Sequence, residues 1–294
     1  MELSIIIVNY NGGNLVLECL RSLEQNPPNG QFEIILIDNA SIDDSASTIE
    51  KQFPYVKVTR CKENIGLTKG FNLGVRKSSG RHLLSLDNDT VVFPDSINHM
   101  VDFLNHRSDA GAVGCALIYP DGTTQQTARR FPSPMNALFG RRSLMTRWFP
   151  ANRFSRRYLM NDFDDETVPF EVDTLSTACM LVRHEVIDSV GAYDEQFFVY
   201  WSDTDWCYRI KEKKWKIFSL PDSEVIHNEN IKAKHRTGRR VKMIIDFHTG
   251  AYRFYRKHYI HSTWNPMNLV AIMGLSGRAA VLILSDEMRR LVVR

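Results

Sequence analysis

Two aspartates one residue apart, Asp87 and Asp89, directly follow an apolar run of strand length at residues 82–86. The pattern predicts that both acids stand at the carboxyl end of a buried strand, where open α/β sheets bind their ligands. Their carboxylates are hard oxygen ligands suited to Mg²⁺ or Mn²⁺, with coordination positions left for a substrate diphosphate. The alternative is a loop in which Asp87 and Asn88 cap the following helix.

Another acid, Asp38, ends a second apolar run at residues 32–37. By the same logic it is placed to accept hydrogen bonds from a nucleotide base or ribose. A glycine-rich segment at residues 64–74 contains Gly66 and Lys69. Its glycines allow close approach of the backbone to a ligand, and Lys69 is positioned to meet a phosphate. An ordinary turn is the alternative for this segment.

The elements that must position these residues alternate between strand and helix. Strand-like runs are at 3–8, 32–37, 56–58 and 82–86, with helical patterns between the first three. This alternation predicts an α/β fold with a parallel, doubly wound nucleotide-binding half. A helix around 97–104 and strands at 112–118, 177–183 and 216–220 follow.

Four motifs in this region resemble those of a known family. They are residues 6–11, residues 37–41, residues 64–66 together with 70–74, and residues 86–89. In this order and spacing they resemble the family 2 glycosyltransferases of the GT-A fold, most closely the bacterial rhamnosyltransferase-like branch, over roughly the first 230 residues. The resemblance implies that Asp38 contacts the nucleotide of a sugar donor and that Asp87 and Asp89 serve the metal. The full expected donor-binding set is Tyr10, Asn11, Asp38, Asn64, Gly66, Lys69, Asp87 and Asn88.

A second pair of acids, Asp203 and Asp205, falls in the first turn of a predicted helix that Ser202 can cap. Acids at this position stabilise a helix N-terminus, which is the simpler interpretation. The segment also resembles the family's Glu-Asp-x-Asp motif, which implies that Asp203 is the general base. Ser202 stands where the family usually has Glu, so any supporting role of that Glu is lost or supplied elsewhere.

His227 follows the strand at 216–220 and the turn at Pro221. A single His in an apolar stretch is more often a hydrogen-bonded core residue than a ligand. The family resemblance implies instead a metal-ligand or phosphate-contacting His. The basic run from Lys232 to Lys242 is either a flexible lid over the diphosphate or a solvated loop.

Composition sets the cellular context. The chain has 294 residues, 43% of them hydrophobic, and five cysteines without a Cys-x-x-Cys pair. These features predict a globular protein with reduced thiols, located in the cytoplasm. Between Asp121 and Asp162 there is no acid but there are eight arginines interleaved with aromatics. This arginine-rich connection suits a lipid phosphate at a membrane surface or nucleic acid, of which we expect the former and no nucleic acid; a solvated loop is the alternative.

The C-terminal part is basic, with 13 Lys+Arg against 4 Asp+Glu from Glu229 to the end. Residues 241–257 have a helical pattern, and residues 268–284 are apolar but interrupted by Gly274, Gly277 and Arg278. We expect this last segment to be too short and too interrupted to span a membrane. It is predicted to lie at a membrane surface, with packing on the catalytic body or on a dimer partner as the alternative.

These observations predict a catalytic domain at residues 1–228 and a basic helical extension at 229–294. The domain comprises a nucleotide-sugar half (1–118) and an acceptor half (119–228). The expected activity is metal-dependent, inverting transfer of a sugar, such as rhamnose or another hexose, from a dTDP- or UDP-linked donor to a glycan or lipid-linked acceptor, at the inner face of a bacterial membrane and in cell-surface polysaccharide synthesis. A homodimer is compatible with the sequence.

Two alternatives remain. A sugar nucleotidyltransferase also combines an α/β nucleotide fold with paired acids, but it would be expected to carry a basic phosphate loop after the first strand, and residues 9–13 contain no basic residue. A non-catalytic membrane-surface binding protein would bind neither metal nor nucleotide sugar.

Overall fold

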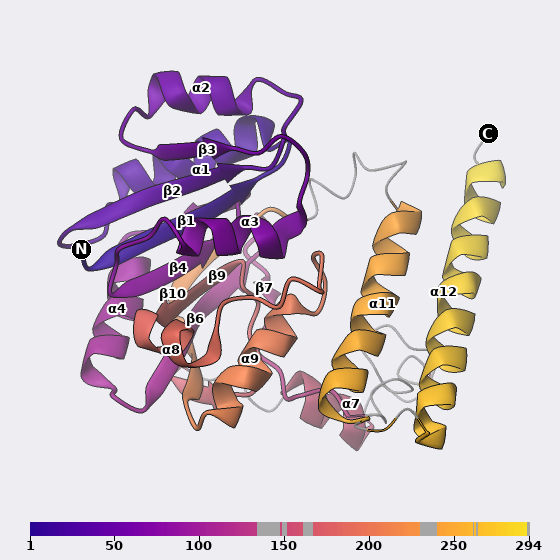
Figure 1. Ribbon diagram of the computed structural model, residues 1–294. Coiled ribbons are helices and arrows are strands. Elements are labelled where there is room, and N and C mark those ends of the chain that lie inside the picture. Colours follow the sequence, from indigo (N-terminus) through magenta and orange to yellow (C-terminus); the bar gives the residue numbers. More distant parts are fainter. Residues whose placement is uncertain are drawn as a thin grey trace.

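The computed structural model describes residues 1–133, 148, 152–160, 167–229, 240–260, 262 and 264–292 (Figure 1). Its described strands form one mixed sheet in the order β3-β2-β1-β4-β9-β6-β10-β5, with β7 paired to β6 and β8 to β10. The strands are β1 (Leu3–Asn9), β2 (Phe32–Asp38), β3 (Lys57–Arg60), β4 (His82–Leu86), β5 (Thr90–Val92), β6 (Ala110–Ile118), β7 (Thr124–Gln125), β8 (Phe170–Val172), β9 (Cys179–Arg183) and β10 (Lys216–His227). The helices are α1 (Gly13–Gln25), α2 (Ser45–Gln52), α3 (Gly66–Val75), α4 (Ser96–His106), α7 (Arg153–Leu159), α8 (His184–Val190), α9 (Ser202–Glu212), α11 (Arg240–His258) and α12 (Pro266–Val292).

The first half of the sheet is parallel, as predicted. Strands β3, β2, β1 and β4 pair in parallel, and helices cover both faces. Along β1, Ile5 and Ile7 pack in one core with residues of α1 and α4, whereas Ile6 packs in a second core with residues of α3 and α9. Both faces of β1 are therefore buried, which explains its uninterrupted apolar run. Each fully buried Ile contributes about 1.5–3 kcal/mol.

The second half of the sheet is mixed. Strand β9 lies antiparallel between β4 and β6, and β10 runs parallel to β6. The sequence predicted a strand ending at Leu220 and a turn at Pro221, but β10 continues through to His227, with its register against β6 shifted between Leu220 and Glu224. The irregularity absorbs the proline, which cannot donate to a strand ladder. Beyond it β10 pairs antiparallel with β5, so that His227 lies opposite Thr90.

The glycine-rich segment is a helix rather than a turn. Helix α3 packs closely on β1, and a Cβ at Gly74 would lie 2.4 Å from Ile6 Cγ2, while one at Gly70 would lie 3.0 Å from Val8 Cγ1. These two glycines are therefore required for helix–strand packing, and their lack of a side chain does not by itself indicate a ligand.

Helices α11 and α12 run side by side at one edge of the molecule, with α12 outermost (Figure 1). Helix α12 is continuous through Gly274 and Gly277, each of which costs only about 1 kcal/mol in a helix. The expectation that this segment is too short and interrupted was wrong: residues Pro266–Met288 are long and apolar enough to cross a membrane, and none of the window is buried in the protein. Most of the arginine-rich connection lies outside the described residues, as does the basic run from Lys232 to Lys242 up to residue 239.

Helix α11 is attached to the catalytic body through α9. Trp201, just before α9, packs against Phe254 of α11 with ring centroids 5.4 Å apart. Beneath this contact the fully buried Asp205 accepts hydrogen bonds from His258 Nε2 and Arg209 Nε, both at 2.8 Å. Lys257 Nζ lies 2.8 Å from the same carboxylate. Burial alone would raise the pKa of Asp205, but these three partners hold it at about 2.

Candidate active site

Three predicted residues meet where β4 and β10 end and β5 begins. One ligand atom each from Asp87, Asp89 and His227 lies within 4.8 Å of the other two. His227 Nε2 is 3.6 Å from Asp87 Oδ2 and 3.6 Å from Asp89 Oδ1. The antiparallel pairing of β10 with β5 produces this arrangement, because it carries a residue distant in sequence to the loop that holds both acids. Two carboxylate oxygens and one imidazole nitrogen suit a divalent cation such as Mn²⁺.

The His227 ring is oriented by Gln125 of β7, a residue that the sequence did not single out. His227 Nδ1 lies 3.0 Å from Gln125 Oε1, so Nδ1 carries the proton and donates it. Gln125 Nε2 in turn donates to the backbone oxygen of His227 at 2.7 Å. This fixes the tautomer in which Nε2 presents its lone pair to the two carboxylates, as supporting residues do in metal sites.

Backbone hydrogen bonds hold the loop of the acids. Asp87 N donates to Ala178 O at 2.8 Å, and Asn228 N donates to Asp89 O at 2.9 Å. The alternative in which Asp87 and Asn88 cap the next helix is wrong, because strand β5 intervenes and α4 begins only at Ser96.

Asn9, at the end of β1, connects this loop to Asp38. Asn88 Nδ2 donates to Asn9 Oδ1 at 2.7 Å, and Asn9 Nδ2 lies 3.2 Å from Asp38 Oδ1. Asp38 therefore stands at the end of β2 as predicted, but only 3% of its surface is exposed. A Cβ at Gly12 would come within 2.3 Å of Asn9 Oδ1 and 2.7 Å of Asn88 Nδ2, so only glycine fits beside this bridge.

Hydrogen bonds also join the loop after β1 to the loop after β2. Asn11 has a left-handed backbone (φ 51°), and its Oδ1 accepts from Ile42 N at 2.9 Å. Its own N–H donates to Ser41 Oγ at 2.9 Å. Tyr10 is half-buried beside it. Asn11 thus joins these two loops.

Asn39, which follows Asp38, positions the segment that contains Asn64 and Gly66. Asn39 Nδ2 donates to Asn64 Oδ1 at 3.0 Å and to Gly66 O at 3.1 Å. Gly66 has φ +87°, and a Cβ there would lie 2.6 Å from the Phe198 ring, so its lack of a side chain serves packing as well as backbone geometry. Lys69 is exposed on α3.

Asp203 lies in the first turn of α9, where its Oδ1 accepts from Thr204 N at 2.7 Å. Burial of the carboxyl raises the pKa of Asp203, while the hydrogen bond from Thr204 and the positive charge of Arg129 oppose the rise. Arg129 belongs to the arginine-rich connection, and its side chain donates to Gln126 O at 3.1 Å. A carboxylate with a raised pKa is a stronger base than an ordinary aspartate.

Tyr193 relates Asp203 to the metal-ligand cluster. The ring is buried between Phe71 and Trp206. Burial raises the pKa of the phenol, and the negative charges of both Asp203 and Asp87 raise it further. The charges of Asp203 on α9 and of Asp87 after β4 are therefore both felt at one hydroxyl.

Asp205, two residues beyond Asp203, has a different environment. It is ionised and fully paired inside the protein, as described above, and attaches α11. The prediction that Ser202 caps α9 is wrong. Ser202 is the first residue of the helix, and its Oγ donates to Val199 O at 2.7 Å. Ser202 consequently supports the loop before the helix.

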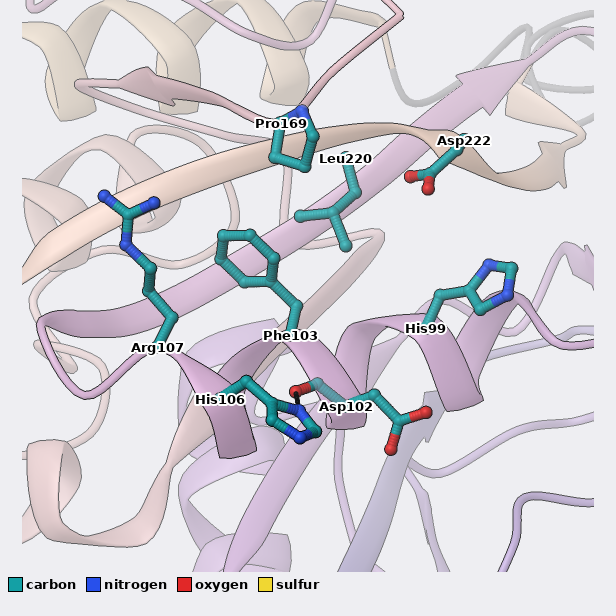
Figure 2. A pocket seen from close by; sticks show the side chains of 8 residues that line it. All are labelled: His99, Asp102, Phe103, His106, Arg107, Pro169, Leu220 and Asp222. Atoms are coloured by element: carbon teal, nitrogen blue, oxygen red, sulfur yellow. Dashed lines mark hydrogen bonds between the residues drawn. The ribbon is translucent and has the colours of Figure 1, made fainter.

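A separate cavity of about 330 Å³ lies between α4 and the bulge of β10 (Figure 2). Its lining includes His99, Asp102 and Asp222, and it contains none of the predicted site residues. Among the described residues, Asp87, Asp89 and His227 are the His, Cys, Asp or Glu side chains that lie close enough together to hold a metal ion.

Comparison with known proteins agrees with this geometry. The chain is 26% identical over 277 residues to an N-acetylglucosaminyl-diphospho-decaprenol L-rhamnosyltransferase of Mycobacterium tuberculosis, covering 89% of this chain and 86% of that protein. Its fold matches GalNAc-T7 solved with UDP, GalNAc and Mn²⁺ (TM-score 0.62, 16% identity, 89% of this chain and 50% of that one). It also matches the mannosyltransferase PcManGT of Pyrobaculum calidifontis solved with GDP-Man and Mn²⁺ (TM-score 0.57, 16% identity, 99% and 80%). The model of glycosyl transferase family 2 matches residues 4–191, and the chain belongs to this family of GT-A glycosyltransferases.

Proposed function

We propose that this glycosyltransferase is metal-dependent and inverting, and that it moves a hexose, such as rhamnose, from a dTDP- or UDP-linked donor to a glycan or lipid-linked acceptor. The observation that carries the proposal is the cluster of Asp87, Asp89 and His227, which offers two carboxylates and an imidazole to one ion. The charges of Asp87 and Asp203 both raise the pKa of the Tyr193 phenol, which supports a cation site and a base near one reacting centre.

The donor set of the cluster fits a divalent cation, which we propose is Mg²⁺ or Mn²⁺, held by Asp87, Asp89 and His227. The bound ion would neutralise the charge that develops on the departing diphosphate. The chain's own contribution is to hold both carboxylates and the imidazole in place before the ion arrives. The hydrogen bonds from Gln125 and from the backbone around Asp87 do this.

Asp203 is proposed to take the proton from the acceptor hydroxyl. The oxygen of that hydroxyl forms a bond to the anomeric carbon as the bond from that carbon to the diphosphate breaks, which inverts the centre in one step. The raised pKa of Asp203 suits this role, because a hydroxyl is a weak acid and needs a strong base. On the donor side, Asp38 and Asn88, with Tyr10, Asn11, Asn64, Gly66 and Lys69, are proposed to bind the nucleotide sugar.

The choice of acceptor rests on the mycobacterial relative, whose name describes rhamnosyl transfer to a lipid-linked diphosphate sugar and 86% of which is covered by the match to this chain. By analogy we propose a role in cell-surface polysaccharide synthesis, with the protein in the cytoplasm and associated with the inner face of the membrane. Membership of a glycosyltransferase family favours this function over a sugar nucleotidyltransferase or a non-catalytic binding protein.

The test combines binding and turnover. The midpoint of thermal unfolding is measured with a panel of nucleotide sugars, each with and without Mn²⁺. A true donor raises the midpoint only when the metal is present, and a concentration 100 times Kd stabilises by about 2.7 kcal/mol. The Asp203→Asn variant is expected to keep this shift and to lose turnover, while Glu212→Gln, an exposed change on the same helix, keeps both. Normal turnover of Asp203→Asn would show that the base is elsewhere.

A further inference from the structure

The polarity of α12 is reversed relative to a helix on the surface of a soluble protein. Its polar residues face α11: Asn268 Oδ1 accepts from Tyr252 Oη at 2.9 Å, and the charge of the half-buried Arg278 reaches His248. Burial lowers the pKa of Arg278, and Asp286 is also buried. A surface helix normally turns apolar residues toward the protein and polar ones toward water.

The outward side of α12 is uncharged and apolar. From Pro266 to Ser285 the sole charged residue is Arg278, which is half-buried. The large apolar side chains exposed on this helix are Met267, Leu269, Val270, Ile272, Met273, Val281, Leu282, Leu284 and Met288. Contiguous exposed apolar surface of this extent on a folded protein marks an interaction site.

The packing of α11 determines how such a helix can meet a bilayer. The Tyr252–Asn268 hydrogen bond and the side-by-side course of the two helices in Figure 1 show that α11 and α12 pack along each other. If α12 crossed the bilayer in this arrangement, α11 would enter the hydrocarbon with it. Helix α11 carries Asp246 and Arg253, and charges at the bilayer centre are costly. The pair therefore fits a membrane with α12 parallel to its plane.

We propose that α12 is a membrane-docking helix that lies in the plane of an anionic phospholipid surface, with its outward side immersed and α11 held between it and the catalytic body. An interfacial helix of this kind sinks about 5–10 Å into the boundary between headgroups and acyl chains. The excess of basic residues in the C-terminal part, 13 against 4 acidic, favours anionic lipid. This inference deepens the proposed membrane location, and it does not depend on the proposed reaction.

The breadth of the apolar side favours a bilayer over a second copy of the chain. At about 100° per residue, Leu269, Met273, Leu284, Val270 and Val281 occupy roughly a third of the helix circumference, and the exposed Ile272 and Met267 extend the apolar side to more than half of it. A partner helix would contact a narrower seam, as in a coiled coil. A fluid lipid surface covers the whole width.

Vesicle flotation of the full chain tests the proposal in the absence of any sugar donor. Vesicles of phosphatidylcholine with phosphatidylglycerol are compared with phosphatidylcholine alone, and we expect binding at least about ten-fold tighter to the anionic vesicles at low salt. The triple variant Val270→Gln, Met273→Gln, Leu284→Gln is expected to bind at least about ten-fold more weakly, because it removes three immersed side chains. Ile42→Gln is the matched control, since Ile42 is 92% exposed on the catalytic body and its replacement should leave binding unchanged.

Three results would overturn the proposal. Equal vesicle binding by the triple variant and the wild type would show that α12 is not the docking surface. Resistance of the bound protein to extraction at alkaline pH would show a spanning helix. A dimer in light scattering that the triple variant abolishes, without vesicle binding by the wild type, would identify a second copy as the occupant. The Mn²⁺-dependent thermal shift with nucleotide sugar is measured on the same variants, so that a failure of membrane docking is distinguished from a failure of the proposed activity.

Discussion

The substitution Asp205→Asn removes the buried charge that attaches α11 to α9. The amide keeps the size of the side chain but leaves His258 and Arg209 without their ionised partner, and Lys257 keeps only its pair with Asp194. One pKa unit corresponds to about 1.4 kcal/mol, so the fall in the pKa of Asp205 from 3.8 to about 2 corresponds to roughly 2.5 kcal/mol in favour of the folded state. Breaking buried ion pairs costs about 3–5 kcal/mol. We expect Asp205→Asn to lose about 2–4 kcal/mol, or roughly 5–15 °C in Tm.

The pH dependence provides a second measurement. Because the pKa of Asp205 is lower in the folded state, its contribution is complete above pH 3.8 and is lost as pH falls from about 4 toward 2. The stability difference between wild type and Asp205→Asn should therefore be constant from pH 7 to 5 and shrink below about pH 4. This stability difference is measured by urea unfolding with tryptophan fluorescence as the signal. Trp201 contacts Phe254, so its fluorescence reports the separation of α11 from the catalytic body.

Glu50→Gln is the control, since it breaks the exposed ion pair of Glu50 with Arg60. Pairs at the surface contribute little, so no measurable change is expected. A difference between wild type and Asp205→Asn that stayed the same at pH 3 as at pH 7 would show that the charge of Asp205 does not stabilise the fold. An Asp205→Asn variant as stable as wild type would show that α11 is attached by its aromatic contacts alone.

Three further predictions concern the site and the core. Gln125→Leu should lower the affinity for Mn²⁺ about 10- to 100-fold in a calorimetric titration, because His227 loses the group that orients its ring; unchanged affinity would show that the ring needs no support. Asp203→Asn should raise Tm at pH 7, because the folded-state pKa of Asp203 is raised and its ionised form is therefore destabilising above the ordinary value; a lower Tm would contradict this sign. Gly74→Ala should destabilise by about 1–3 kcal/mol in urea unfolding, because its Cβ would lie 2.4 Å from a side chain of β1; Gly277→Ala, with nothing within 4 Å, should be neutral or slightly stabilising, and equal effects would exclude close packing as the cause.

The parallel half of the fold and the position of the paired acids were predictable from sequence. An apolar run of strand length predicts a buried strand, and the acid that follows it, Asp38 or Asp87, predicts a polar group at the strand's carboxyl end. The position of His227 beside the two acids was not predictable from the apolar pattern of the sequence. It depends on the register shift in β10 and on antiparallel pairing with β5, and neither has a local sequence signature. Gln125, whose partner is 102 residues away, has no periodic signal at all.

The prediction for α12 failed for a different reason. Glycines and a charge within an apolar run lower the expectation of a long helix, but α12 continues through Gly274 and Gly277, and Arg278 is half-buried in it. Ser202 was predicted as a cap because residue type alone suggests it, whereas the structure places Trp201 at that position with a left-handed backbone. In both segments tertiary contacts override local preference.

Asn9 links the loop that holds Asp87 and Asp89 to Asp38 at the end of β2. One carboxamide receives the middle residue of the Asp-x-Asp loop on its oxygen and reaches the acid of the neighbouring strand through its nitrogen. The loop proposed to hold the cation and the acid proposed to contact the nucleotide are thus joined before any ligand arrives, which spares binding the entropy of assembling them. Replacement of Asn9 would therefore disturb both proposed contacts together.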